Sequence, residues 1–259
     1  MPKMKHEQIG PLTTIDEFSE LLGLQKEVWG LAAADVVPVH TFKAVSSFMG
    51  PKGTVLGYFL DGKIAGYVLT FPTSNPKEVH VDMIGVSKNH QHKGIGSKLL
   101  LALRTIMLQH DVDTISWTFD PLESVNANLY IAKLGGIVTR HFTDFYGSVS
   151  SPLHSGLPTD RFRVEWHIRT QLVQERIERQ IEKTDIFSTP NCAISACVEI
   201  PLNIQDLRNG NIKEALEWRM KTREQFDDLV EKKNLVGIDF TYDPINQKGL
   251  YVFQEKCNE

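Results

Sequence analysis

The chain has 259 residues, of which 41% are hydrophobic and 23% charged, and its net charge is −4. This composition is typical of a globular protein, and the slight acidity disfavours nucleic acid and anionic membranes as partners. We expect neither a membrane span nor a signal peptide, because no apolar run is long enough and the first residues are polar. Three cysteines without a Cys-x-x-Cys pair favour a reduced, cytoplasmic setting and disfavour a disulfide framework or a zinc site.

The first half of the chain is predicted to fold as a strand, two helices, three strands, a helix and a strand. Thr14 is expected to cap the first helix, with Glu17 completing a capping box. Asp61-Gly62 between two β-branched apolar segments predicts a tight hairpin. The expected elements are strand 9–12, helices 14–30 and 41–49, strands 53–60, 63–71 and 77–86, helix 95–109 and strand 114–119.

The second half continues with a helix that glycine at position 135 is expected to end. The strand meander before helix 95–109 favours a mixed α/β fold, with a largely antiparallel sheet flanked by helices, over a doubly wound parallel fold. The last third is too small to bury a core alone, so we expect an α+β extension that packs on the rest. The predicted domains are residues 1–169 and 170–259. The further elements are helix 125–133, strands 137–142 and 160–168, helix 170–183, an irregular segment from 184, strand 193–201, helix 212–233 and strands 235–242 and 249–253.

Residues 86–96, Val-Ser-Lys-Asn-His-Gln-His-Lys-Gly-Ile-Gly, join an apolar strand to a helix. Unpaired backbone N–H groups and the positive end of the helix dipole meet at such a junction, which suits phosphate oxygens. Gly94 and Gly96 carry no side chain where an anion must approach the backbone, and Lys93 and Lys98 add positive charge. The glycine spacing fits neither a P-loop nor a Rossmann fingerprint. An ordinary capped turn is the alternative interpretation.

Residues 91–96, Gln-His-Lys-Gly-Ile-Gly, resemble the pyrophosphate-binding signature of the GNAT superfamily of N-acyltransferases, Gln/Arg-x-x-Gly-x-Gly/Ala. Residues 126–135 resemble a second pattern of that family, Asn-x-x-Ala…Leu-Tyr-x-Lys-Leu-Gly-Phe, although Gly136 stands where the family has an aromatic residue. Further runs between 117 and 166 resemble one branch, that of predicted acetyltransferases. The resemblance implies the GNAT fold and acetyl-CoA, or another acyl-CoA, as co-substrate, without a metal.

The resemblance also implies which residues bind this co-substrate. They lie at the end of strand 77–86, in the glycine turn and at the start of the following helices. Backbone N–H groups at the end of the strand could also polarise the thioester carbonyl, as an oxyanion hole does. The cofactor-binding residues are Ile84, Gly85, Val86, Gln91, His92, Lys93, Gly94, Ile95, Gly96, Ser97 and Asn126.

Three residues are candidates for catalysis. In the resembled family the tyrosine at the position of Tyr130 protonates the departing CoA thiolate, a step that suits a weak acid; the alternative is a tyrosine of the core. Acyl transfer to an amine also needs a base. His80, Asp82 and Ile84 are expected to share one face of their strand. His80 has a suitable pKa, and Asp82 stands where GNAT proteins often carry an acidic residue. The alternative is a polar edge or a substrate-binding pair without proton transfer.

The sequence leaves two interpretations for each of two charged pairs. Asp160 and Arg161 are a candidate site for a carboxylate-bearing substrate, with an internal salt bridge as the alternative. Arg219 and Arg223 lie four residues apart on one helix face. They either bind an anion or face solvent.

The expected function is transfer of an acyl group, acetyl in the simplest case, from acyl-CoA to a primary amine of a small molecule. An amino acid is one such acceptor, and the amine attacks directly, without a covalent enzyme intermediate. One alternative is a non-catalytic acyl-CoA-binding or regulatory module of the same fold. Another is a succinyl-CoA-dependent amino-acid N-succinyltransferase. A homodimer is left open.

Overall fold

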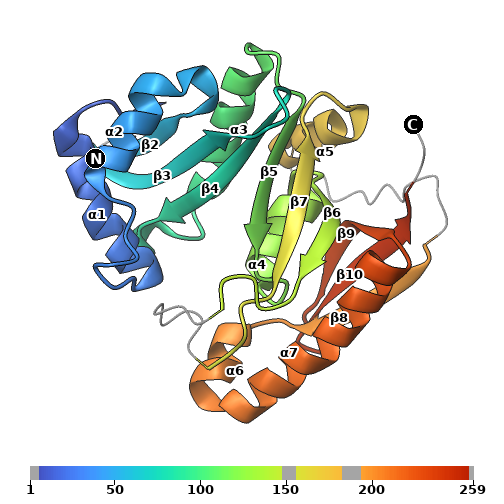
Figure 1. Cartoon of the computed structure of the whole chain (residues 1–259). Helices are drawn as coiled ribbons and strands as arrows, with labels where there is room; N and C mark the ends of the chain where they lie inside the picture. The colour runs from blue at the N-terminus through green and yellow to red at the C-terminus, as the bar shows by residue number, and fades with distance from the viewer. Residues whose placement is uncertain (1–5, 148–155, 183–193, 257–259) are drawn as a thin grey trace. The chain divides into compact units, whose positions relative to one another are not determined.

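The computed structural model describes residues 6–147, 156–182 and 194–256 (Figure 1). The chain forms two compact units: the described residues up to Ser116 belong to unit 1, and the described residues from Trp117 onward belong to unit 2. The boundary falls inside strand β5, Thr114–Phe119. Cys192, Cys257 and residues 148–155, between the predicted strands 137–142 and 160–168, lie outside the described ranges. The domain boundary predicted after residue 169 is not the boundary between these two units, which follows Ser116, and it stays a prediction.

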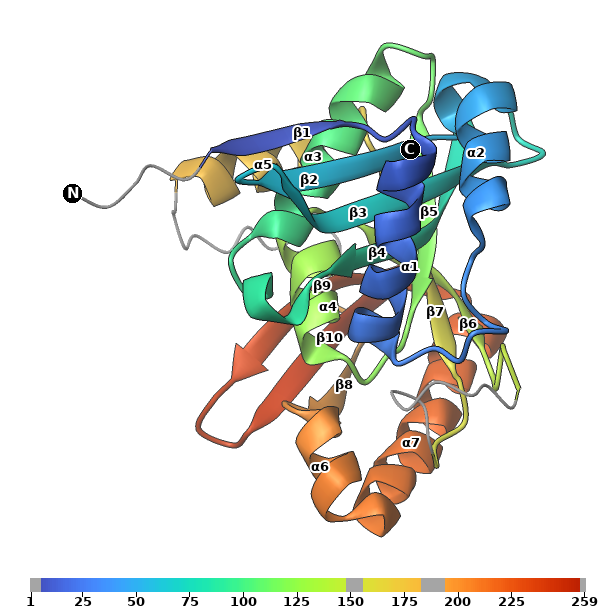
Figure 2. The same cartoon turned by 90° about the vertical axis from the view of Figure 1, so that its left-hand side faces the viewer.

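Unit 1 is an antiparallel sheet with helices on both faces (Figure 2). A Cβ added at Gly85 would meet the Trp29 ring, whereas one added at Gly66 would meet Ile95, so the first two helices and the third helix cover opposite faces. The strands, in spatial order, are β1 Glu7–Pro11, β2 Val55–Leu60, β3 Lys63–Pro72 and β4 Glu78–Val86; the helices are α1 Ile15–Trp29, α2 Val39–Phe48 and α3 Ile95–Leu108.

Local sequence signals begin and end these elements as expected. The Thr14 hydroxyl accepts a hydrogen bond from the Glu17 N–H at 3.3 Å, and the Glu17 carboxylate accepts one from the Thr14 N–H at 2.9 Å. The hairpin between β2 and β3 turns through left-handed residues, Asp61 at φ 51° and Gly62 at φ 81°. Such a two-residue turn matches the twist of its strands. The predicted capping box and hairpin are therefore confirmed.

Strand β4 contains a bulge that the alternation of its sequence does not reveal. Leu69 of β3 pairs with Met83, and the next residue, Thr70, pairs with Val81. Asp82 is thus an extra residue without a partner on β3. A bulge of this kind shifts the side chains beyond it to the other face of the strand.

The expected common face of His80, Asp82 and Ile84 is therefore wrong for Ile84. His80 pairs with Phe71, and both Phe71 and Met83 pack against the core under α1 and α2. His80 consequently shares its face with Met83, while Ile84 faces the other way. The physical reason is the bulge, which breaks the period of two between residues 81 and 83.

Unit 2 is built on a second set of antiparallel strands, and two π-helical turns extend its helices. Helix α6 and these π-helical turns are not predicted from the sequence. The strands follow the end of β5 in the order β7 Arg161–His167, β6 Ile137–Phe142, β9 Leu235–Asp243, β10 Lys248–Glu255 and β8 Ala196–Pro201. The helical segments are α4 Ser124–Ala127, the π-turn Asn128–Lys133, α5 Gln171–Glu182, α6 Ile204–Gly210, α7 Ile212–Phe226 and the π-turn Asp227–Lys232.

An aromatic core joins the two halves of unit 2. The Phe226 ring of α7 lies 4.6 Å from that of Phe162 in β7 and 5.6 Å from that of Tyr251 in β10. The Tyr251 hydroxyl donates to the Pro121 carbonyl at 2.7 Å. Residues from before and after position 170 thus share one buried cluster, in keeping with a C-terminal segment too small to bury a core alone.

No helix in the described part of the chain combines the length and the apolar character that crossing a membrane requires.

Candidate functional site

The turn between β4 and α3 has the backbone conformation of an anion-binding helix start. Its residues His92 and Gly94 are left-handed, with φ of 59° and 78°. Gly94 is the N-cap residue, and the first α-helical bond runs from the Lys98 N–H to the Gly94 carbonyl at 3.0 Å. The N–H groups ahead of that bond have no acceptor within an α-helix, and the helix dipole adds positive potential there. The turn can therefore receive phosphate oxygens.

Side chains brace this turn from within. Gln91 Nε2 donates to the Val86 carbonyl at 3.1 Å, which ties the turn to the end of β4. Lys93 Nζ donates to the Asn89 carbonyl at 2.6 Å. The side-chain amide of Gln91 thus holds the turn in shape. The N–H groups suited to an anion belong to the backbone of the turn.

Lys98, which the sequence places near the turn, directs its charge to the first two strands. Its Nζ lies 2.5 Å from the Glu7 carboxylate and 3.5 Å from the Tyr58 hydroxyl. The hydrogen bond to Glu7 raises the pKa of Lys98, so the side chain stays charged. Because this charge is paired, it adds less to the potential at the turn than the sequence suggests.

His80 belongs to a group of hydrogen-bonded side chains within unit 1. The Ser116 hydroxyl donates to Glu78 Oε1 at 2.6 Å, and His80 Nδ1 lies 3.2 Å from the same hydroxyl. Ser116 is fully buried and Glu78 nearly so. A buried serine and carboxylate therefore set the orientation of the imidazole, which neighbouring protein rather than solvent holds in place.

Asp82, the extra residue of the bulge, is exposed, yet the surrounding protein desolvates its carboxyl group and raises its pKa. Burial raises the pKa of Tyr67 well above its usual range, and the charge of Asp82 adds to this shift. Tyr67 belongs to the core under α1 and α2, the core that His80 also faces. The structure thus places Asp82 two residues from His80 on β4, with its charge within electrostatic reach of that core.

Tyr130 lies in the π-helical turn Asn128–Lys133 and is only 6% exposed. Its ring packs edge-to-face on Trp117 at 5.1 Å and on Phe119 at 5.4 Å. Burial, and then the charge of Glu123, raise its pKa well above the usual range. The phenol is therefore protonated at physiological pH, as a proton donor must be. π-Helical turns often mark functional sites, although the aromatic surroundings also fit a core residue.

Gly136, which departs from the family pattern, has a steric explanation. A Cβ at this position would lie 2.6 Å from Val164 Cγ1 and 2.8 Å from the Tyr130 carbonyl oxygen. That carbonyl also accepts a hydrogen bond from the Gly136 N–H at 2.9 Å. β7 thus occupies the space that an aromatic side chain would need. Asn126, the remaining predicted cofactor residue, is half-buried in α4.

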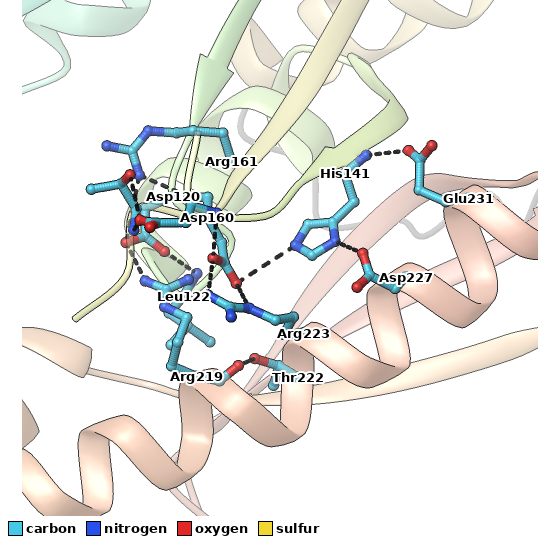
Figure 3. Close-up of polar contacts among 12 residues, drawn as sticks. Asp120, Leu122, His141, Asp160, Arg161, Arg219, Thr222, Arg223, Asp227 and Glu231 are labelled. Atoms are coloured by element: carbon cyan, nitrogen blue, oxygen red, sulfur yellow. Dashed lines mark hydrogen bonds and ion pairs between the residues drawn. The ribbon is translucent and has the colours of Figure 1, made fainter. Parts of the chain in front are cut away.

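Asp160 and Arg161 are held inside unit 2 (Figure 3). Arg223 clamps the Asp160 carboxylate, with Nε at 2.9 Å and Nη2 at 2.6 Å. The Asp144 N–H donates to the same carboxylate at 3.0 Å. Asp160 is 1% exposed and Arg161 is 5% exposed. This geometry favours the internal salt bridge over a substrate carboxylate site.

A second buried pair lies one helical turn away on α7 (Figure 3). Arg219 Nη2 is 2.5 Å from Asp120 Oδ2, and Arg161 Nη1 is 3.9 Å from the same oxygen. Burial by itself raises the pKa of Asp120, but the charge and hydrogen bond of Arg219 outweigh it and lower the pKa. Arg219 and Arg223 therefore do meet anions, which are internal carboxylates. The i, i+4 spacing of the arginines was the sequence signal for these partners.

Glu123 beside this pair predicts a dependence of stability on pH. Burial, and then the charge of Asp120, raise its pKa from 4.5 to about 7. The folded state thus holds a proton between these values that the unfolded state has lost, so this residue's contribution to stability falls as pH rises through that window. Glu123→Gln should therefore stabilise the protein above pH 7 by roughly 1–3 kcal/mol, and have little effect below pH 4.

Urea unfolding of both proteins at pH 4 and pH 8 measures this difference. Gln205 Nε2 donates to Glu123 Oε1, and a glutamine carbonyl can accept the same bond, so the substitution is a matched one. Glu224→Gln on the exposed side of α7 is the control. Equal shifts for the two variants at pH 8 would contradict the assignment.

Within residues 6–147, 156–182 and 194–256, no group of three or more His, Cys, Asp or Glu side chains is placed to hold a metal ion.

The chain has a mostly antiparallel sheet in which one strand passes through a glycine turn into the start of a helix, a mixed α/β fold. Solved structures that share this fold include three acetyltransferases. The ribosomal-protein-S18-alanine N-acetyltransferase of Escherichia coli is 18% identical, with a TM-score of 0.52 over 64% of this chain and 96% of that one. Diaminobutyrate acetyltransferase EctA of Paenibacillus lautus is 14% identical, with a TM-score of 0.51 over 65% and 99% of the two chains. A GNAT-family acetyltransferase of Streptococcus pneumoniae is 16% identical, with a TM-score of 0.51 over 62% and 98%.

Residues 18–135 match the model of the acetyltransferase (GNAT) family. Residues 18–135 therefore resemble a GNAT acetyltransferase domain, which confirms the predicted resemblance, and the predicted fold class is confirmed. No curated protein sequence matches the chain.

Proposed function

We propose that the protein is an N-acyltransferase that moves an acyl group from acyl-CoA, with acetyl-CoA as the simplest donor, to a primary amine of a small molecule. The observation that carries this proposal is the turn capped by Gly94, where a left-handed glycine opens the start of α3 inside the matched domain. The structure of EctA holds coenzyme A together with L-2,4-diaminobutyric acid, which supports a diamino or amino acid as the acceptor class.

The proposed cofactor contacts follow from the geometry of the turn. Main-chain N–H groups of residues 92–97 receive the diphosphate of the acyl-CoA, while Gln91 keeps the turn attached to β4. N–H groups at the end of β4, residues 84–86, polarise the thioester carbonyl. Asn126 of α4 is a further proposed contact, which the family resemblance implies.

The proposed chemistry is direct attack on the thioester. The amine nitrogen bonds to the carbonyl carbon, and the carbon–sulfur bond then breaks to release the thiolate. His80 takes a proton from the cationic acceptor amine before it attacks, and Asp82, two residues along β4, attracts that cation. Tyr130 donates a proton to the thiolate, and its hydroxyl is restored as the nitrogen releases its second proton on forming the amide.

A substitution at Gly94 tests the loop. The φ of 78° disfavours side chains other than those of Asn and Asp, and no atom lies within 4 Å of an added Cβ. Gly94→Glu places a strained, negatively charged residue at the helix start, and should weaken CoA binding at least about 30-fold because it repels the diphosphate. Calorimetric titration with CoA measures this. Gly94→Asn, which tolerates the left-handed backbone, is the matched control and should bind within a few-fold of the parent; equal affinity of all three proteins would reject the assignment.

Tyr130→Phe tests the proposed acid. Loss of the hydroxyl should slow thiol release about 10- to 100-fold, because the thiolate then leaves without a proton donor, while CoA affinity stays unchanged. Stopped-flow detection of free CoA measures the rate. With an acyl donor whose leaving thiol has a lower pKa, the difference in the rate of thiol release between the variant and the parent should be smaller. Normal turnover of the variant would assign Tyr130 to the core alone.

The donor and acceptor are identified by a thiol-release screen of amines and amino acids with acetyl-CoA and succinyl-CoA. Turnover with acetyl-CoA and a small amine supports the proposal, and preference for succinyl-CoA would assign an N-succinyltransferase. Binding of CoA without turnover across the panel would instead favour a regulatory module. Use of acyl-CoA and the absence of paired cysteine spacing favour a cytoplasmic setting. Gel filtration with light scattering distinguishes a monomer from a homodimer.

A further inference from the structure

A polar chain of three side chains lies under the face of β4 that carries His80. Glu78 and His80 are two residues apart on β4 and so project to the same face. Ser116, on the neighbouring part of β5, lies between them: its hydroxyl donates to Glu78 Oε1 at 2.6 Å and is 3.2 Å from His80 Nδ1. Ser116 is 0% exposed and Glu78 9%.

The position of the imidazole proton follows from counting protons along this chain. A serine hydroxyl has one proton, and Ser116 gives it to Glu78, whose carboxylate can only accept. The contact with Nδ1 therefore requires the imidazole to be the donor. A neutral imidazole carries its proton on one nitrogen only, so His80 has Nδ1–H and a lone pair on Nε2.

We propose that Glu78 and Ser116 are positioning residues, which hold His80 in the Nδ1–H tautomer and so make Nε2 the proton acceptor in acyl transfer. The inference rests on the proposed function, in which His80 is the base. The logic is that of a base oriented by a third group, with the serine inserted between carboxylate and imidazole. A wrong tautomer would offer an N–H to the amine in place of a lone pair, and the amine could not transfer its proton.

The tautomer is read directly from the ¹⁵N shifts of the imidazole in protein labelled with ¹⁵N-histidine, at a pH where the imidazole is neutral. His80→Gln identifies the signals. The parent should show Nδ1–H and an unprotonated Nε2. Ser116→Ala removes the acceptor and should abolish this preference, while Ser116→Thr keeps a hydroxyl and should restore it. Glu78→Met frees the serine proton for Nδ1, and should reverse the tautomer to Nε2–H.

The same variants are assayed for thiol release with acetyl-CoA and the best amine of the screen. Ser116→Ala and Glu78→Met should lower kcat/KM about 10-fold or more, Ser116→Thr less, and CoA affinity should not change. Ser19→Ala, an exposed serine of α1, is the control and should match the parent.

An Nε2–H tautomer in the parent, or an unchanged tautomer in both Ser116→Ala and Glu78→Met, would overturn the inference. A second result would also overturn the inference: the two variants show the expected tautomers, their kcat/KM is unchanged, and His80→Gln is inactive. The proposed function would then stand, because His80 would still be needed for turnover. Normal turnover of His80→Gln would instead reject the base assignment itself.

Discussion

Replacement of His80 by glutamine is expected to lower kcat/KM about 10²–10⁴-fold, because it removes the only group in the proposed mechanism that accepts the amine proton. Glutamine is polar and close to histidine in size, and Ser116 keeps its hydrogen bond to Glu78, so the fold should be retained. Thiol release at saturating acetyl-CoA measures the effect. CoA affinity should be unchanged, since the cofactor turn is formed by other residues.

Two further measurements sharpen this test. His110→Gln, an exposed histidine just beyond α3, should be fully active. Because deprotonated amine needs no base, the defect of His80→Gln should shrink at pH values where the acceptor is already neutral. A defect of constant size across that range would assign His80 to substrate binding, and Asp82 would then be the candidate base.

Loss of the buried arginine of α7 is expected to be the most destabilising change among the charged residues. Arg219→Met should lower the free energy of unfolding by about 3–5 kcal/mol, because Asp120 keeps its buried charge and loses the partner at 2.5 Å. Arg161 remains, but at 3.9 Å it compensates poorly. Urea unfolding followed by tryptophan fluorescence measures the loss. Lys213→Met, an exposed cation on the same helix, should change stability by less than about 0.5 kcal/mol.

The pH dependence identifies the cause. A carboxyl whose folded pKa is lowered stabilises the protein above its unfolded value, and this contribution is lost as pH falls through the folded value. In the Arg219→Met variant Asp120 protonates more readily, so the difference from the parent should narrow below about pH 4. In the double variant Asp120→Asn, Arg219→Met, the cost should be well below the sum of the single ones. Additive effects would mean that the pair does not interact.

The elements of unit 1 are largely readable from local sequence, because the signals concern neighbours in the chain. Thr14 and Glu17 form the predicted capping box, and Asp61 and Gly62 the predicted hairpin. Gly94 takes the left-handed conformation at the predicted start of α3. A cap, a two-residue turn and a helix N-terminus each depend on a few adjacent residues, so the sequence alone specifies them.

Features that depend on residues distant in the sequence could not be predicted from these local signals. The bulge at Asp82 arises from the register between β3 and β4, and it moves Ile84 away from the face of His80. The π-helical turn at Tyr130 and the close approach of Val164 to Gly136 likewise depend on how helix and sheet pack. Side-chain period and family pattern carry no information about such contacts.

The sequence by itself therefore determined the fold class, the family resemblance of residues 18–135 and the glycine turn proposed to bind acyl-CoA. Only the tertiary structure decided which charged and polar groups meet. Ser116 and Glu78 are 38 positions apart, and Arg219 and Asp120 are 99 apart. Burial compels such groups to find partners, since an unpaired buried charge or hydroxyl is costly, but packing of the whole chain selects which partner each one finds.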